Sequence, residues 1–240
     1  MIFKKLIVIL LIILCLIIFT ISISILFKDF VAYKENNTST EQLIQDVIQT
    51  DETTEESCIN WQQLQKINED IIGWIEIENT NINYPILKDN NLYYINHSYD
   101  KKYNKNGSIF TTNAAPFIDQ ETIIYGHNMK NGTMFSELGK YLKKDFLDST
   151  NIIKIYTPTG DYECKIFSVY STCIDDENTN IKSLNFEERI EYYKKSSKYN
   201  ITNVENISKI IKLSTCSYIN AKITPTDQRY YILASVIPIM

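Results

Sequence analysis

The chain has 240 residues, of which 44% are hydrophobic and 22% charged, and its formal net charge is -5 at pH 7. This length fits one globular domain with appendages. The acidic balance argues against a general nucleic-acid-binding protein, which is usually basic, so we expect no nucleic-acid partner. The 17 tyrosines and 10 phenylalanines favour β-strands.

The N-terminal segment is a short basic head followed by a long apolar run. Residues 1–5 include Lys4 and Lys5, and residues 6–27 are almost continuously apolar. A helix of about 22 residues at ~1.5 Å per residue crosses a bilayer core, and it exceeds the apolar part of a cleaved signal peptide. We therefore predict an uncleaved single-pass anchor over residues 6–27 in the cell membrane. Lys4 and Lys5 assign residues 1–5 to the cytoplasm by the positive-inside rule, and the remaining chain to the outside.

Residues 28–58 are polar, become acidic towards their end and contain no Gly or Pro. Within them Leu43, Ile44, Val47 and Ile48 recur at helical spacing, which indicates a short helix. The composition is typical of a solvated spacer, so we predict an extracytoplasmic stalk. The globular domain then covers residues 59–240.

Three segments of the globular domain have the pattern of helices. Residues 60–72 place apolar side chains on one face, with Asn60 as a cap and Gly73 as the end. Residues 135–146 and 186–199 also read as helical. The apolar face of the last segment consists of Phe186, Ile190 and Tyr193.

Short runs typical of β-strands, separated by turn residues, fill most of the remaining domain. They cover residues 74–77, 82–87, 107–111, 121–125, 152–156, 162–170, 207–213 and 230–237. Many short strands with turns between them predict a mainly β fold, either a sandwich or a closed barrel.

The last two strand-like runs carry a candidate nucleophile and a candidate cation. The first run ends at Leu213-Ser214-Thr215-Cys216, and the second begins at Arg229, after a polar connection. If the two strands pair antiparallel, the thiol and the guanidinium come close together. A nearby cation lowers the pKa of a thiol and stabilises a developing oxyanion. Taken alone, Cys216 also fits a buried structural thiol, because free Cys is among the most buried residue types.

His127 is the candidate partner of this cysteine. It lies in Tyr125-Gly126-His127-Asn128-Met129, where a loop begins after an apolar run. A cysteine nucleophile needs a nearby base or imidazolium, which need not be close in sequence. His97, the other histidine, has no such context, and we interpret it as a surface residue. No C-x-x-C or H-E-x-x-H spacing is present, so we predict neither a metal site nor a cofactor.

Four further cysteines accompany Cys216. Cys15 lies in the apolar run, Cys58 ends the stalk, and Cys164 and Cys173 flank one strand-like run. A disulfide between Cys164 and Cys173 is compatible with an extracellular location, but their spacing does not establish one. A catalytic Cys216 must remain reduced, so we expect no stable bridge to it.

The motifs together resemble those of class B sortases. The resemblance covers the chain from about Trp61 to its C-terminus and includes the segments around His127, Cys216 and Arg229. Its further matches are Gly73-Trp74-Ile75, Thr80-Asn81-Ile82-Asn83-Tyr84-Pro85, Gly107-Ser108-Ile109-Phe110 and Met134-Phe135. All of these occur in order behind a predicted membrane anchor.

This resemblance implies a fold and an activity. The fold is a closed β-barrel of about eight strands, with an N-terminal helix and a helix before the cysteine strand. The activity is that of a cysteine transpeptidase with His127, Cys216 and Arg229 as catalytic residues. Such enzymes cleave a C-terminal sorting signal of the type Asn/Ser-Pro-x-Thr-Gly/Asn after Thr. The implied partners are secreted proteins that carry this signal and an amine of the lipid-linked peptidoglycan precursor.

The resemblance also implies a substrate pocket beside the cysteine. The residue before the cysteine, Thr215, belongs to the family's pocket, and Ser214, Tyr125, Asn128 and Tyr218 are further candidates. Two departures from the family pattern concern this region. Ser217-Tyr218 follows the cysteine where many members have an acidic residue, and Thr111-Thr112-Asn113 follows Phe110 in place of the usual stretch.

Three other functions remain open at the level of sequence. A papain-like wall hydrolase normally has its Cys before its His, whereas His127 precedes Cys216 here. An L,D-transpeptidase carries both residues in one compact motif, which is absent. A membrane-tethered peptide-binding domain without activity is disfavoured by the intact set of Cys, His and Arg.

Overall fold

A computed structural model describes residues 2–50, 57–218 and 226–239 of the chain. These residues form two compact units, Met1–Cys58 and Ile59–Met240. Residues 51–56 of the predicted stalk and 219–225 of the connection after Cys216 lie outside the described residues.

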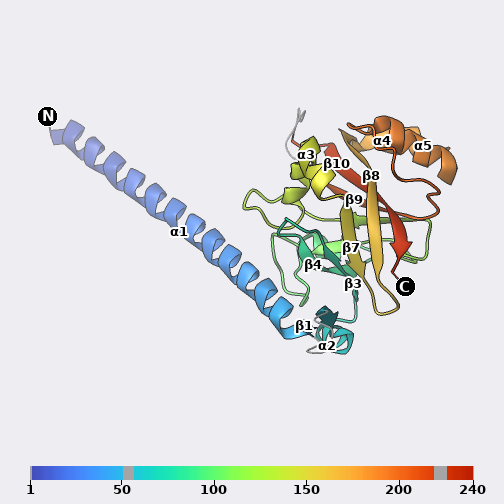
Figure 1. Cartoon of the computed structure of the whole chain (residues 1–240). Coiled ribbons are helices and arrows are strands. Elements are labelled where there is room, and N and C mark those ends of the chain that lie inside the picture. The colour runs from blue at the N-terminus through green and yellow to red at the C-terminus, as the bar shows by residue number, and fades with distance from the viewer. Residues whose placement is uncertain (1, 51–56, 219–225, 240) are drawn as a thin grey trace. The chain divides into compact units, whose positions relative to one another are not determined.

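The first unit consists mainly of one long helix, α1 (Ile2–Val47) (Figure 1). Within it, Ile9–Lys28 is long and apolar enough to cross a membrane, with a mean hydropathy of 3.2. The helix continues past the predicted end of the anchor and through the first part of the predicted stalk. Two short strands, β1 (Ile48–Thr50) and β2 (Ser57–Ile59), pair with each other after it.

The second unit is a closed barrel of eight strands, in the order β10-β8-β7-β3-β4-β5-β6-β9. Neighbouring strands pair antiparallel except β4 with β5 and β6 with β9, which are parallel. The strands are β3 (Ile71–Glu76), β4 (Asn83–Lys88), β5 (Ile109–Thr111), β6 (Glu121–Tyr125), β7 (Ile152–Tyr156), β8 (Tyr162–Cys173), β9 (Ile210–Cys216) and β10 (Gln228–Pro238). The predicted mainly β, closed-barrel fold is confirmed.

The barrel interior holds the main apolar core. Alternate residues of each strand point inward, as the period of two requires, and bury branched aliphatic and aromatic side chains. Ile211 and Leu213 of β9 and Ile232 of β10 are examples that are fully buried. A second apolar cluster lies on the outside of β8, β9 and β10.

Two helices, α4 (Ile174–Ile181) and α5 (Phe186–Ser196), follow β8 and lie side by side outside it (Figure 1). Asn185 and Glu188 form a capping box at the start of α5. The predicted buried face of α5, Phe186, Ile190 and Tyr193, is confirmed. The sequence did not predict α4.

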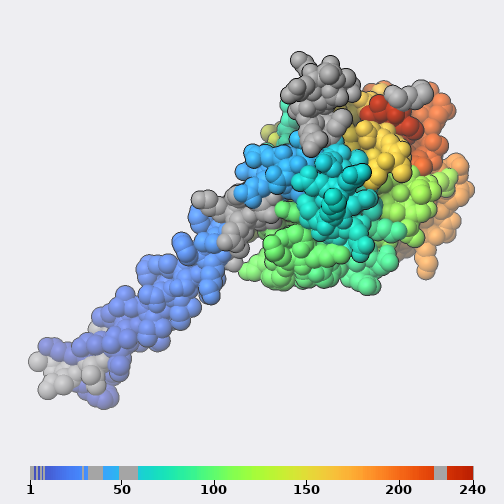
Figure 2. Space-filling view, turned by 90° about the horizontal axis from the view of Figure 1, so that it is seen from below, coloured from blue at the N-terminus to red at the C-terminus, as the bar shows by residue number. Residues whose placement is uncertain are grey.

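The first helix of this unit, α2 (Trp61–Ile67), is shorter than the predicted helix over residues 60–72. Its predicted cap is confirmed, because the Asn60 side chain accepts a hydrogen bond from the Gln63 amide at 3.0 Å. The predicted end at Gly73 is wrong. Asn68 ends α2 in an extended conformation, and Gly73 lies within β3. Figure 2 shows this α2 segment, in cyan, on the outer surface of the barrel unit.

The predicted helix over residues 135–146 is replaced by two short elements. A 3-10 helix, η2 (Ser136–Leu142), is followed by α3 (Lys144–Ser149), and Lys143 between them is extended. A further 3-10 turn, η1 (Tyr93–Ile95), lies in the long loop between β4 and β5.

Candidate active site

The parallel pairing of β6 and β9 brings His127 and Cys216 to the same edge of the barrel. Tyr125 is paired with Ser214, and the Gly126 amide donates to the Ser214 carbonyl at 3.2 Å. His127 and Cys216 each lie two residues beyond that pair. Parallel strands that end together present their following residues side by side.

Arg229 reaches the same place from the other neighbour of β9. Strands β9 and β10 pair antiparallel, and Arg229 is directly opposite Cys216. The predicted antiparallel pairing is therefore confirmed. The Arg229 Nη1 donates to the carbonyls of Thr226 at 3.0 Å and Gln228 at 3.1 Å, which hold the guanidinium in place.

All three side chains border one cleft of about 270 Å³. Its floor is the outer face of β6, β9 and β10, and its walls come from α4 and from the loop that contains η1. The lining residues are Leu92, Ile95, Phe110, Ile123, Tyr125, Gly126, His127, Ile174, Glu177, Asn178, Ile181, Lys212, Ser214, Thr215, Cys216, Arg229 and Tyr231. A mostly apolar cleft with a few convergent polar groups is typical of a ligand site.

His127 and the neighbouring Asn128 are tied to their surroundings by hydrogen bonds. The Nε2 of His127 lies 2.7 Å from the carbonyl oxygen of Ile95. The Nδ2 of Asn128 donates to the carbonyl oxygen of Cys216 at 2.8 Å. Asn128 therefore links the loop that carries the histidine to the end of the strand that carries the cysteine.

The Sortase domain family matches residues 75–237. A thiol, an imidazole and a guanidinium in one cleft of a closed barrel agree with that match. The chain belongs to the sortase family.

The similar proteins are sortases B. The chain is 43% identical to sortase B of Listeria monocytogenes over 64% of its own length and 65% of the relative's. It is 30% identical to sortase B of Staphylococcus aureus over 75% of each chain. Among solved structures, a Staphylococcus aureus sortase B-substrate complex superposes with a TM-score of 0.70 and 27% identity, over 86% of this chain and 98% of that one.

The remaining predicted pocket residues of this sortase lie at different depths. Tyr125 and Ser214 line the cleft on the outer face of the sheet. Burial raises the pKa of Tyr125, so its phenol stays protonated. The Thr215 hydroxyl is buried and is without a hydrogen-bond partner among the described residues. Tyr218 is 59% exposed and does not belong to the described lining of the cleft.

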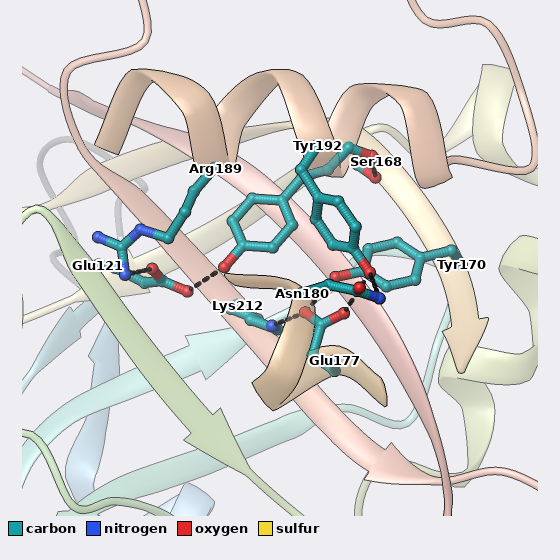
Figure 3. A network of polar contacts seen from close by, with 9 residues as sticks. Glu121, Ser168, Tyr170, Glu177, Asn180, Arg189, Tyr192 and Lys212 are labelled. Atoms are coloured by element: carbon teal, nitrogen blue, oxygen red, sulfur yellow. Dashed lines mark hydrogen bonds and ion pairs between the residues drawn. The ribbon is translucent and has the colours of Figure 1, made fainter. Parts of the chain in front are cut away.

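Helix α4 forms one wall of the cleft and is held by a buried polar network (Figure 3). Glu177 of α4 and Lys212 of β9 form an ion pair, and they are 1% and 2% exposed. Glu177 also accepts hydrogen bonds from the hydroxyls of Tyr170 at 2.6 Å and Tyr192 at 3.2 Å. Burial and the adjacent Glu177 raise the pKa of Tyr170, which keeps it a donor.

The Lys212 ammonium is enclosed by aromatic rings in addition to Glu177. It lies 4.2 Å from the ring centroid of Tyr231 and 4.8 Å from that of Tyr193. Such contacts stabilise a desolvated cation. A second ion pair, Arg189 with Glu121 at 3.0 Å, lies beside this network in Figure 3.

The other cysteines with described side chains take no part in the site. Cys15, Cys164, Cys173 and Cys216 are free thiols. Cys164 and Cys173 lie near opposite ends of β8, opposite Val236 and Gln228 of β10. They are therefore too far apart for the disulfide that their spacing left open. Burial raises the pKa of Cys164, which makes it unreactive.

Sequence reasoning missed the two walls of the cleft. Glu177 lies in an unpredicted helix, and Ile95 contributes through its main chain. One signal was available for the first wall, since Lys212 interrupts the apolar run Ile210-Ile211-Lys212-Leu213. A lysine there, 2% exposed, requires a buried acidic partner. No pattern in the sequence indicates the contact of the Ile95 carbonyl with His127.

Proposed function

We propose that this chain is a sortase B-type cysteine transpeptidase. It cleaves a sorting signal of the type Asn/Ser-Pro-x-Thr-Gly/Asn after Thr and transfers the protein to an amine of the cell-wall precursor. The observation that carries the proposal is the common cleft of Cys216, His127 and Arg229 in a chain of the sortase family.

Cys216 is the proposed nucleophile. Its thiolate attacks the Thr carbonyl carbon and gives a tetrahedral intermediate with an oxyanion. The cysteine is partly exposed at the end of β9 and borders the cleft, as a nucleophile must. The Asn128 amide holds its main-chain carbonyl, which supports a fixed position for the thiol.

Arg229 is the proposed partner of the oxyanion. It lies directly opposite Cys216, and its two carbonyl contacts hold its positive charge in a fixed position at the cleft. A group oriented in advance stabilises developing charge without reorganising during the reaction. Its planar fork also offers donors to the carbonyls of a bound peptide.

His127 is the proposed general acid and base. As an imidazolium it gives a proton to the departing amine when the C–N bond breaks, which leaves a thioester on Cys216. The incoming amine then attacks the thioester carbonyl, His127 takes its proton, and the C–S bond breaks to restore the thiolate. A positioned acid or base of this kind contributes about 10²–10⁴ in rate.

We also propose that α1 anchors the enzyme in the cell membrane, with residues 1–5 in the cytoplasm and the barrel outside. The apolar segment Ile9–Lys28 and the preceding Lys4 and Lys5 support this topology. This orientation exposes the cleft to secreted proteins and to lipid-linked precursors at the outer surface of the cell membrane.

The test uses the full-length protein in detergent micelles. It is mixed with peptides that contain Pro-x-Thr, preceded by Asn or Ser and followed by Gly or Asn, and with triglycine as the acceptor. Mass spectrometry is expected to find cleavage after Thr, triglycine joined to the Thr carbonyl, and no product with Cys216→Ala. A folded protein that yields neither cleavage nor adduct across the whole set would contradict the proposal and favour a peptide-binding domain.

A further inference from the structure

His127 contacts a main-chain carbonyl as well as the cleft. Its Nε2 is 2.7 Å from the oxygen of Ile95. A carbonyl oxygen only accepts hydrogen bonds, so Nε2 must carry a proton in this contact. In neutral imidazole the other nitrogen, Nδ1, is then the acceptor. The contact with Ile95 therefore selects one of the two tautomers and fixes the plane of the ring.

A histidine that exchanges protons beside a nucleophile needs such a third group, because the partner of one nitrogen decides what the other can do. In many enzymes the third group is a carboxylate or an amide side chain. Among the hydrogen bonds of the described residues, the Ile95 carbonyl is the acceptor found at the His127 ring. In this chain the acceptor beside His127 is therefore a main-chain carbonyl and not a side chain.

The position of the Ile95 carbonyl depends on the neighbouring Tyr94, which is 1% exposed. The Tyr94 hydroxyl donates to Asp70 Oδ2 at 2.6 Å and accepts from Asn68 Nδ2 at 2.7 Å. Its carbonyl accepts from the Ser108 amide at 2.9 Å. The residue before Ile95 is thus anchored through both its side chain and its main chain.

Asp70 is a suitable anchor because it stays ionised. Burial acts to raise the pKa of this carboxyl. The hydrogen bond from Tyr94 and the contact with Lys101, at 3.0 Å, outweigh burial and lower the pKa overall. An ionised acceptor makes the bond from the Tyr94 hydroxyl a charge-assisted one, which is stronger than a neutral pair.

Gly107 packs against the same peptide. It has a φ of +59°, which glycine adopts readily. A Cβ at this residue would lie 2.5 Å from the Ile95 oxygen and 2.7 Å from the Tyr94 oxygen. Any side chain at residue 107 therefore requires a shift between residue 107 and the carbonyl that contacts His127.

We propose that Tyr94 and Gly107 are positioning residues that hold the Ile95 carbonyl against His127 and so set the tautomer and orientation of the catalytic imidazole. The kinetic part of this inference rests on the proposed transpeptidase function. The structural part, the protonation of Nε2, needs no substrate. It also accounts for a glycine in the Gly107-Ser108-Ile109-Phe110 segment.

The direct test is an NMR spectrum of the full-length protein labelled with ¹⁵N-histidine, in detergent micelles. The chain has two histidines, and His97→Gln assigns the remaining signals to His127. We expect neutral His127 to carry its proton on Nε2. In Gly107→Ala we expect a mixture of tautomers. A proton on Nδ1 in the unmodified protein would overturn the inference, even if the transpeptidase is active.

The kinetic test compares Gly107→Ala with Gly160→Ala. Both glycines have positive φ, but a Cβ at Gly160 meets no atom within 4 Å. We expect kcat of Gly107→Ala to fall about 10- to 100-fold with KM changed less than about twofold, because positioned acid–base catalysis is impaired. Gly160→Ala should retain both constants. Equal kcat in Gly107→Ala and the unmodified protein, with an unchanged spectrum, would overturn the inference.

Tyr94→Phe is the second variant, and it tests the positioning of the Ile95 carbonyl if Gly107→Ala fails to fold. It keeps the buried ring and removes only the hydroxyl that joins Asp70 and Asn68. We expect a decrease in kcat of about 3- to 10-fold and a changed His127 spectrum, because a slightly displaced general acid loses only part of its contribution to the rate. A folded Tyr94→Phe protein with an unchanged spectrum and kcat would count against the proposal. Failure of the unmodified protein to transfer peptides contradicts the proposed function alone.

Discussion

The two faces of strand β9 differ in what they bury. The inward face places Ile211 and Leu213 in an apolar core that contains no ion pair among the described residues. The outward face carries Lys212, Ser214 and Cys216 in the cleft. Successive side chains of β9 point alternately to the inward and the outward face, so both faces belong to one strand.

The difference shows how a barrel separates stability from chemistry. The inward residues gain free energy from burial of apolar surface and close packing. The outward residues include a buried ammonium and a thiol. Such groups contribute little to the stability of the fold, and a buried charge lowers it unless the charge is paired. The ion pair of Lys212 with Glu177 holds α4, which forms one wall of the cleft.

The sharpest test of this separation is Cys216→Ala. We expect transpeptidation to fall below detection, because Cys216 is the proposed nucleophile and is the one thiol among the described residues that line the cleft. The urea midpoint, followed by the fluorescence of Trp61 and Trp74, should be nearly unchanged. A variant that loses stability as well as activity would show that the outward face also supports the fold.

Lys212→Met tests the wall of the cleft. It leaves the Glu177 carboxylate buried without its cation, which costs about 3–5 kcal/mol in the free energy of unfolding. We expect a large decrease in the urea midpoint and a higher KM, because α4 lines the cleft. The double variant Lys212→Met/Glu177→Gln should recover much of the stability. A double variant no more stable than the single one would contradict the role of the pair.

Leu213→Ala is the matched change on the inward face. Loss of a fully buried leucine costs about 2–5 kcal/mol in the free energy of unfolding. We expect kcat of the folded fraction to remain close to that of the unmodified protein, as measured below the unfolding temperature. Leu213→Met, which conserves volume, serves as the control and should cost less than about 1.5 kcal/mol.

Arg229→Lys tests whether the outward face needs the planar guanidinium or only a positive charge. Lysine cannot make the same fixed contacts with the carbonyls of Thr226 and Gln228. We expect kcat to fall about 10- to 100-fold, less than the loss of a full oxyanion donor. Arg189→Lys, the corresponding change at the other arginine, should leave kcat unchanged. Unchanged turnover in Arg229→Lys would show that the reaction does not need the planar guanidinium.

Much of this arrangement could be predicted from local sequence. Short apolar runs predict the strands β6, β9 and β10, and their approximate ranges are confirmed. The predicted end of α2 at Gly73 was wrong, and the helix ends at Asn68. The helical spacing of apolar residues continues past Asn68, but the Asn68 side chain donates hydrogen bonds to Tyr94 and Tyr99. Helix α4 was missed because it is short and polar apart from two isoleucines.

By itself, the sequence determined the long apolar run of α1 and the succession of short strands, and it predicted Cys216, His127 and Arg229 as a set of candidate residues. These follow from composition, from short apolar runs between turn residues and from motifs, all of which depend on neighbouring residues. Only the tertiary structure decided the parallel register of β6 with β9, the buried pair of Lys212 with Glu177, and the contact of Ile95 with His127. Those features join residues far apart in the chain, and they exist because the closed barrel satisfies burial and hydrogen bonding for all of its strands at once.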